Sequence, residues 1–145
     1  MKYNLNRLLE EELIQGIPKN QEKAKLSMKT SNKWLEEAKK NLKNKTYRSC
    51  ILSSYLAMFH SARAILYADG YREKSHFAVA RYLESQYTDK DKLEEKWIEL
   101  LDHTREKRHG DQYGISFTAT KKEAKNALNS AEKFTRRMEE LLENK

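Results

Sequence analysis

The run from Tyr47 to Leu66 limits the possible folds of this chain more than any other stretch. Large apolar and aromatic residues alternate in it with small ones, so a helix through the run is apolar or small nearly all round. Neighbouring elements must cover such a helix on several sides, and its small side chains let them approach closely. The run therefore predicts the central helix of a helical bundle. Its small residues are Ser53, Ser54, Ala57, Ser61, Ala62 and Ala64.

The rest of the chain holds few residues that would interrupt a helix. Its 145 residues include four Gly and one Pro, which favours long helices over a fold with many turns. Apolar residues recur at helical spacing in the segments 5–15, 20–44, 47–69, 75–87, 93–108 and 124–142. We predict an all-α fold, an up-and-down antiparallel four-helix bundle with one or two short additional helices. No strand is expected.

The length of the chain suits one domain. We expect residues 1–145 to form a single helical domain, with an amphipathic N-terminal arm over residues 1–18 and the bundle over residues 20–145. The apolar side of the arm needs cover, either from its own bundle or from a second subunit. The residues on that side are Leu5, Leu8, Leu9, Leu13 and Ile14.

Short polar residues and a glycine mark where the helices begin and end. In a capping box, a short polar side chain and a Glu three residues later each accept a backbone N–H of the other residue. The predicted signals are Asn20 and Ser75 as N-caps, Gly70 as a left-handed C-cap, Asp91 with Glu94 and Thr120 with Glu123 as capping boxes, and Gly110 to Phe117 as a break.

The charge of the chain is moderately basic. Its net charge of +7 attracts phosphate groups but is below that of a nucleic-acid-binding arm. The many lysines of segment 20–44 are typical of a solvated helix face. No apolar run is long enough to cross a membrane and the first residues do not resemble a secretory signal, so we expect a cytoplasmic protein with no membrane partner. Cys50, the single cysteine, cannot form an internal disulfide and is expected to be a buried thiol.

A polar cluster at the end of segment 93–108 holds the candidate site residues, which are Arg105, Arg108, His109, Asp111 and Tyr113. Arg105 and His109 are four residues apart and so share one helix face. Arg108 continues the apolar stripe, where a guanidinium needs a carboxylate, a carbonyl or a ligand. Two arginines beside an imidazole suit the binding or cleavage of a phosphodiester. The alternative is structural: cations near a helix C-terminus complement its dipole, and Asp111 could pair with Arg108.

No metal ion or cofactor is predicted. The four histidines do not form a recognised ligand motif. The sequence also has neither a glycine-rich phosphate loop nor a nucleophile elbow, and Ser53 and Ser54 are interpreted as packing residues.

Taken together in order, several segments resemble the HEPN family, small helical domains named for their occurrence in higher eukaryotes and prokaryotes and for nucleotide binding. The resemblance implies a helical bundle that forms a homodimer and is often encoded beside a minimal nucleotidyltransferase, in pairs that include toxin–antitoxin systems. The matching segments are Trp34-Leu35-Glu36-Glu37-Ala38, Tyr55 to Leu66, Gly70, Lys74-Ser75-His76, Arg108 to Tyr113, Glu123-Ala124 and Ala131-Glu132-Lys133-Phe134.

The family's ribonucleases are metal-independent and carry an Arg followed, after four to six residues, by a His. In this chain only three residues separate Arg105 from His109, whereas four residues separate Arg108 from Tyr113, which stands where such a nuclease would carry its histidine. The stretch resembles instead a subfamily with Arg, a short spacer and Asp-Tyr, here altered to Asp111-Gln112-Tyr113. In some related pairs a tyrosine near this position is adenylylated by the partner enzyme, which makes Tyr113 the modification candidate.

Three functions stay open at this point. The leading one is a homodimeric module that binds RNA or a nucleotide around Arg105, Arg108, His109, Asp111 and Tyr113, and that pairs with a minimal nucleotidyltransferase. The second is a metal-independent endoribonuclease, in which His109 is the general base and Arg105 or Arg108 stabilises the transition state. The third is a structural dimer or interaction protein without a ligand.

Overall fold

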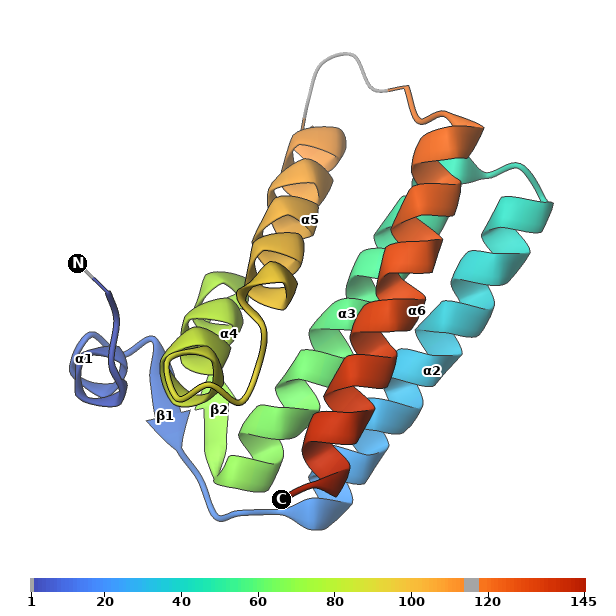
Figure 1. Cartoon of the computed structure of the whole chain (residues 1–145). Helices are drawn as coiled ribbons and strands as arrows, with labels where there is room; N and C mark the ends of the chain where they lie inside the picture. The colour runs from blue at the N-terminus through green and yellow to red at the C-terminus, as the bar shows by residue number, and fades with distance from the viewer. Residues whose placement is uncertain (1, 114–117) are drawn as a thin grey trace.

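The predicted all-α bundle is confirmed. The computed structural model describes residues 2–113 and 118–145, and of residues 109–113 it describes the backbone alone. Figure 1 shows the long helices running up and down in alternation, with consecutive helices antiparallel. These helices are α2 (Gln21–Lys43), α3 (Tyr47–Asp69), α5 (Glu95–Tyr113) and α6 (Lys121–Glu143), and a shorter helix, α4 (His76–Leu83), lies between α3 and α5 in the chain.

Helix α3 is the central helix that its composition predicted. It contacts α2, α4, α5 and α6, and most of its residues are buried. At the contact with α3, two small serine side chains of α2 donate hydrogen bonds to backbone carbonyls of α3. Ser31 Oγ donates to the carbonyl of Ala57 at 2.6 Å, and Ser27 Oγ donates to that of His60 at 2.7 Å. Small residues on both helices therefore allow a close contact and satisfy their own polar groups.

The N-terminal arm differs from the single helix predicted over residues 5–15. Helix α1 (Leu5–Glu10) ends early, Glu12 has a φ of 57°, and strand β1 (Ile14–Gly16) follows. Strand β1 pairs antiparallel with β2 (Tyr71–Glu73), with Ile14 opposite Glu73. The prediction of a helix to residue 15 and of no strand was wrong, because the edge of β2 offers this segment a hydrogen-bonding partner that is remote in the sequence.

The apolar side of the arm packs on its own chain. Leu8 and Ile14 are 0% and 2% exposed, whereas Leu9 is 38% exposed. The cover for the arm therefore comes mainly from its own bundle.

Most of the predicted helix ends are confirmed. The side chains of Asn20 and Ser75 accept from the backbone N–H groups of Lys23 and Ala78, at 2.9 and 3.2 Å. Gly70 ends α3 in the left-handed conformation, with a φ of 91°. Thr120 and Glu123 form the predicted capping box at the start of α6.

The connection between α4 and α5 is irregular and was not foreseen. A π-helical turn, η1 (Glu84–Thr88), follows α4 directly, and Asp91 then adopts a φ of 58°. The capping box predicted for Asp91 with Glu94 is wrong, because α5 begins only at Glu95 and Asp91 lies in the turn before it. The other end of α5 differs too: the predicted break starts at Gly110, whereas the helix continues to Tyr113.

Candidate functional site

Two of the predicted site residues lie together in a cavity, with a histidine that the site prediction left out. Arg105 and Arg108 of α5 line a cavity of about 370 Å³ with His76, the first residue of α4, and with Glu106. We call this the α4–α5 cavity. Helices α4 and α5 pack against each other, so residues remote in sequence meet there.

The ring of His76 is held on two sides. It stacks on the ring of Phe59, with centroids 3.9 Å apart, and its Nδ1 lies 2.7 Å from the hydroxyl oxygen of Tyr55. Both partners come from α3. Within the described part of the chain Nε2 has no hydrogen-bond partner, so it is the nitrogen left for a ligand.

Burial sets the protonation of this pair. Loss of solvent lowers the pKa of His76, and the nearby charge of Arg108 lowers it further. Loss of solvent also raises the pKa of Tyr55 to about 12, although Arg108 acts in the opposite direction. At neutral pH the imidazole is therefore uncharged and the phenol keeps its proton. When the phenol donates to Nδ1, the ring proton is on Nε2, which then donates to a ligand.

The guanidinium of Arg108 lies against an aromatic ring. Its Cζ is 5.2 Å from the centroid of the Tyr55 ring, and the residue is half-buried. Arg108 thus occupies the core-facing position that the stripe predicted, and the ring supplies part of the compensation that a buried cation needs. Among the residues whose side chains are described it has no carboxylate partner.

Arg105 is more firmly fixed. Its Nη1 donates to Oδ1 of Asp102 at 2.8 Å, and its Cζ lies 5.4 Å from the centroid of the Phe77 ring. Asp102 also accepts from Arg81 of α4. The Asp102 carboxylate thus joins α5 to α4 beside the cavity. Glu84 and Glu106 also lie 3.6 and 3.8 Å from the guanidinium groups of Arg81 and Arg105, so the charges of these two arginines are balanced locally.

His76 lies where two cavities meet. It also lines a second cavity of about 430 Å³, together with Arg63, Arg72 and Lys74. Arg63 is paired there with Glu73, through Nε–Oε1 and Nη2–Oε2 distances of 3.0 and 2.8 Å. Basic groups of α3, β2 and α5 therefore surround the imidazole on both sides.

Three predicted site residues are not tested by this geometry. The side chains of His109, Asp111 and Tyr113 lie outside the described residues, as does the suggested pairing of Asp111 with Arg108. The backbone places all three in the last turn and a half of α5, on the same helix as Arg105 and Arg108.

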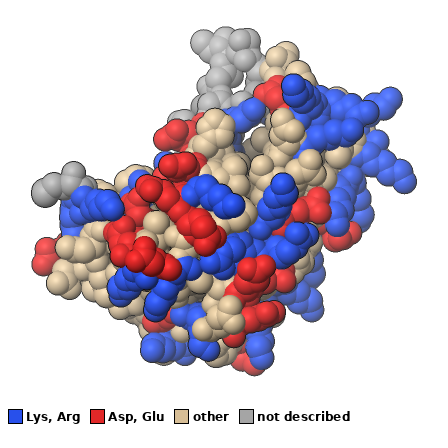
Figure 2. Space-filling model, in the orientation of Figure 1, with Lys and Arg blue, Asp and Glu red and all other residues tan. Residues whose placement is uncertain are grey.

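The charged side chains are distributed unevenly over the face of the molecule that Figure 2 shows. Figure 2 shows blue basic side chains gathered over the upper ends of α6 and its neighbours, whereas acidic and basic side chains alternate over α4 and the start of α5. In the described part of the chain no group of three or more His, Cys, Asp or Glu side chains could hold a metal ion. Of the helices described, none combines the length and the apolar character needed to cross a membrane.

Comparisons with known proteins agree with this fold. The model of the HEPN domain family matches residues 24–141, which include most of α2 and α6 and the whole of α3, α4 and α5. A curated relative is 28% identical over 108 residues, which are 74% of this chain and 80% of the relative, and it is named "Putative toxin MJ0605" of Methanocaldococcus jannaschii. With most of its length matched by the family model, this chain belongs to the HEPN domain family.

Proposed function

We propose that this HEPN protein is a toxin-like module that binds RNA or a nucleotide at the α4–α5 cavity. The observation that carries the proposal is the meeting of His76, Arg105 and Arg108 at one cavity. Arginines bind phosphate groups through several N–H donors at once, and an uncharged imidazole with its proton on Nε2 adds one more donor. The neighbouring cavity, with Arg72 and Lys74, extends the basic surface for a longer strand.

The toxin-like part of the proposal comes from the Methanocaldococcus jannaschii relative, which is named "Putative toxin MJ0605". The expected homodimer and the minimal nucleotidyltransferase partner belong to the same proposal, with Tyr113 as the side chain that the partner would modify. Light scattering tests the dimer: a mass of twice 17.2 kDa supports it, and a mass of one chain at micromolar concentration contradicts it. Co-purification with the product of a neighbouring nucleotidyltransferase gene tests the pairing.

Gel-shift titration of single-stranded RNA in EDTA tests the binding site. We expect Arg108→Ala to weaken binding by about tenfold, because it removes charge-assisted hydrogen bonds to phosphate, and the affinity to fall as salt rises. Arg136→Ala is the matched control, since Arg136 is an exposed arginine of α6 that does not line the α4–α5 cavity. Equal loss in the two variants, or no loss in either, would contradict the site.

A metal-independent endoribonuclease is the second candidate, and the position of His76 favours it as well. An imidazole beside two arginines is a suitable base for the 2′-hydroxyl of RNA, with the guanidinium groups at the developing oxyanion. His109 was the base expected from the sequence, and His76 is now an alternative to it. As a base, His76 needs its proton on Nδ1, donated to Tyr55, whereas as a donor in binding it needs its proton on Nε2.

Cleavage of a mixed tRNA pool in EDTA separates the two functions. If the protein is a nuclease, the wild-type chain cleaves the RNA and Arg108→Ala lowers the cleavage rate by about 100-fold or more. The variants His76→Ala and His109→Ala then identify which histidine is required. A binding module shifts the RNA without cleaving it. Nitrogen-15 chemical shifts of the His76 ring give the tautomer and provide a readout that does not depend on activity.

A further inference from the structure

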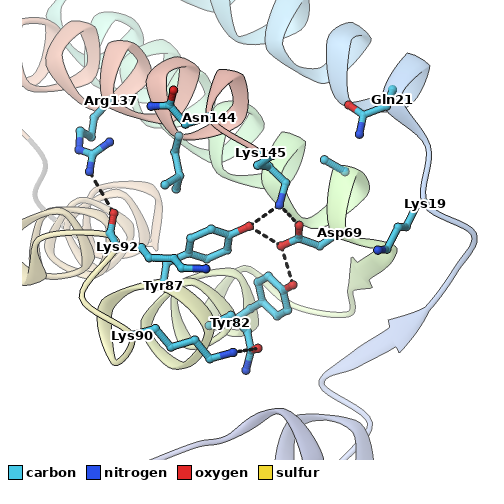
Figure 3. A pocket seen from close by; sticks show the side chains of 13 residues that line it. Lys19, Gln21, Asp69, Tyr82, Tyr87, Lys90, Lys92, Arg137, Asn144 and Lys145 are labelled. Carbon is cyan, nitrogen blue, oxygen red and sulfur yellow. Dashed lines mark hydrogen bonds and ion pairs between the residues drawn. The ribbon is translucent and has the colours of Figure 1, made fainter.

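A cavity larger than the α4–α5 cavity lies at the end of the bundle where α3 and α6 end. It has a volume of about 900 Å³, and we call it the basal cavity. Figure 3 shows that five parts of the chain supply its walls: the segment before α2, the end of α3, the region from α4 through η1, the turn before α5, and the end of α6. None of its lining residues belongs to the α4–α5 cavity.

The base of this cavity is a network of hydrogen bonds around one carboxylate. Oδ2 of Asp69 accepts from the hydroxyls of Tyr82 and Tyr87, at 2.7 and 2.6 Å, and Oδ1 accepts from Nζ of Lys145. Burial raises the pKa of both tyrosines, so their hydroxyls keep the protons that they donate. Because three donors already satisfy this carboxylate, it does not require a cation from outside.

The rim of the cavity has an excess of positive charge. Five cationic side chains and a single carboxylate line the cavity. Lys145 is bonded to Asp69 and Arg137 to Glu94. Among the residues described, the side chains of Lys19 and Lys92 have no acidic partner, and Lys90 donates only to the amide oxygen of Gln86, at 3.2 Å.

An unusual backbone places these groups on the cavity. Tyr87 lies in the π-helical turn η1, and its backbone carbonyl accepts from the backbone N–H of Lys92 at 2.8 Å. Asp91, between Lys90 and Lys92, has a φ of 58°. Single π-helical turns and left-handed residues other than glycine are uncommon, and both are concentrated at functional sites. This backbone accounts for the position of Lys90 and Lys92 beside Tyr87 on the same cavity.

We propose that the basal cavity binds a pyrophosphoryl group, either free or as the phosphate tail of a nucleotide. Lys19, Lys90 and Lys92 bind its oxygens as mobile point charges, and the two tyrosines with Asp69 form a fixed base below them. The cavity has room for more than a single phosphate ion. This site is separate from the RNA or nucleotide site proposed at the α4–α5 cavity.

Isothermal titration calorimetry of the full chain tests the site, with inorganic pyrophosphate, ATP and adenosine as probes. We expect pyrophosphate and ATP to bind and adenosine not to bind. The double variant Lys90→Ala/Lys92→Ala should weaken binding by about tenfold or more, since two charge-assisted interactions are removed. Lys33→Ala is the control, because Lys33 is an exposed lysine of α2 that does not line the basal cavity. ATP binding that the lysine double variant weakens and Arg108→Ala leaves unchanged, without pyrophosphate binding, would assign the basal cavity to nucleotides. The same pattern with both probes would assign it to the pyrophosphoryl group itself.

Two further results decide whether this proposal stands apart from the proposed function. Arg108→Ala should weaken RNA binding and leave pyrophosphate binding unchanged. The double variant Lys90→Ala/Lys92→Ala should weaken pyrophosphate binding and leave RNA binding unchanged. The proposal is overturned if neither anion binds at millimolar concentration, if the lysine double variant binds as wild type does, or if Arg108→Ala abolishes pyrophosphate binding. Circular dichroism and the melting temperature confirm that each variant is folded.

Discussion

The hydroxyl oxygen of Tyr55 lies 2.7 Å from Nδ1 of His76, which joins the middle of the central helix to the first turn of α4. The imidazole also stacks on Phe59. A ring fixed by a hydrogen bond and by stacking presents Nε2 in one direction only. The site therefore depends on the packing of α4 against α3 as much as on the residues of α5.

The first prediction concerns the titration of His76. Burial and the charge of Arg108 hold its pKa below the usual 6.5, although Glu73 acts in the opposite direction. Below pH 6.5 the unfolded chain therefore binds more protons at this residue than the folded chain does. The contribution of the uncharged His76 to the free energy of unfolding is complete above pH 6.5 and is lost as the pH falls toward the pKa of the folded state. Proton NMR titration of the ring and urea denaturation at pH 7 and pH 5 measure the two effects.

His60 contributes in the same direction, because burial lowers its pKa too. His76→Gln should therefore reduce the pH dependence of stability without abolishing it. An NMR pKa for His76 at or above 6.5 would contradict the buried, uncharged imidazole.

The second prediction concerns the ion pair between Arg63 and Glu73, which joins α3 to β2. Glu73 is only 6% exposed in its side chain, and the pair has two N–H···O bonds. Glu73→Leu should lower the free energy of unfolding by about 3 kcal/mol, because it leaves a partly buried guanidinium without its partner. Denaturation in urea measures the loss. Glu36→Gln, which breaks the exposed pair with Lys39, should cost at most about 1 kcal/mol; equal losses would contradict the importance of burial.

The third prediction compares two glycines. Gly70 has a φ of 91°, and an added Cβ would lie 3.0 Å from the carbonyl oxygen of Ile17 and from Cγ of Lys19. Gly70→Ala should therefore destabilise the chain by more than the roughly 1–2 kcal/mol of a left-handed alanine alone. Gly16 has no atom within 4 Å of an added Cβ, so Gly16→Ala should be neutral or slightly stabilising. Thermal melts of both variants test the difference.

The fourth prediction concerns the thiol of Cys50. The residue is fully buried, and loss of solvent raises the pKa of the thiol, so thiolate is scarce and inaccessible. In native buffer a thiol reagent should react far more slowly than in denaturing urea, where one thiol per chain becomes available. Rapid reaction of the folded protein would show that this part of α3 opens readily.

The helices could be predicted because their signals are local. Asn20, Ser75 and Thr120 each accept from the N–H group of the residue three positions later, so both partners lie in one short stretch of sequence. Strand β1 could not be predicted in this way, because its partner β2 is remote in the chain. The turn η1 was not predicted for another reason. A single wider π-helical turn does not change the spacing of the apolar residues enough to be recognised in the sequence.

The candidate site shows the same division. Arg105 and Arg108 were found from their spacing on one helix. His76 was noted only as part of the family resemblance, because nothing in its own segment shows that α4 packs beside α5. Its position directly after the capping Ser75 was the one available signal, since a side chain in the first turn of a helix is held in a defined direction.

The two-stranded sheet has a consequence for the order in which the chain folds. Strands β1 and β2 are separated by the whole of α2 and α3, so their ends meet only after those two helices have packed against each other. The entropy of closing so long a segment is repaid by few hydrogen bonds. We therefore expect the arm to dock last and to undock first, so that Leu8 and Ile14 are exposed in openings that leave the bundle intact.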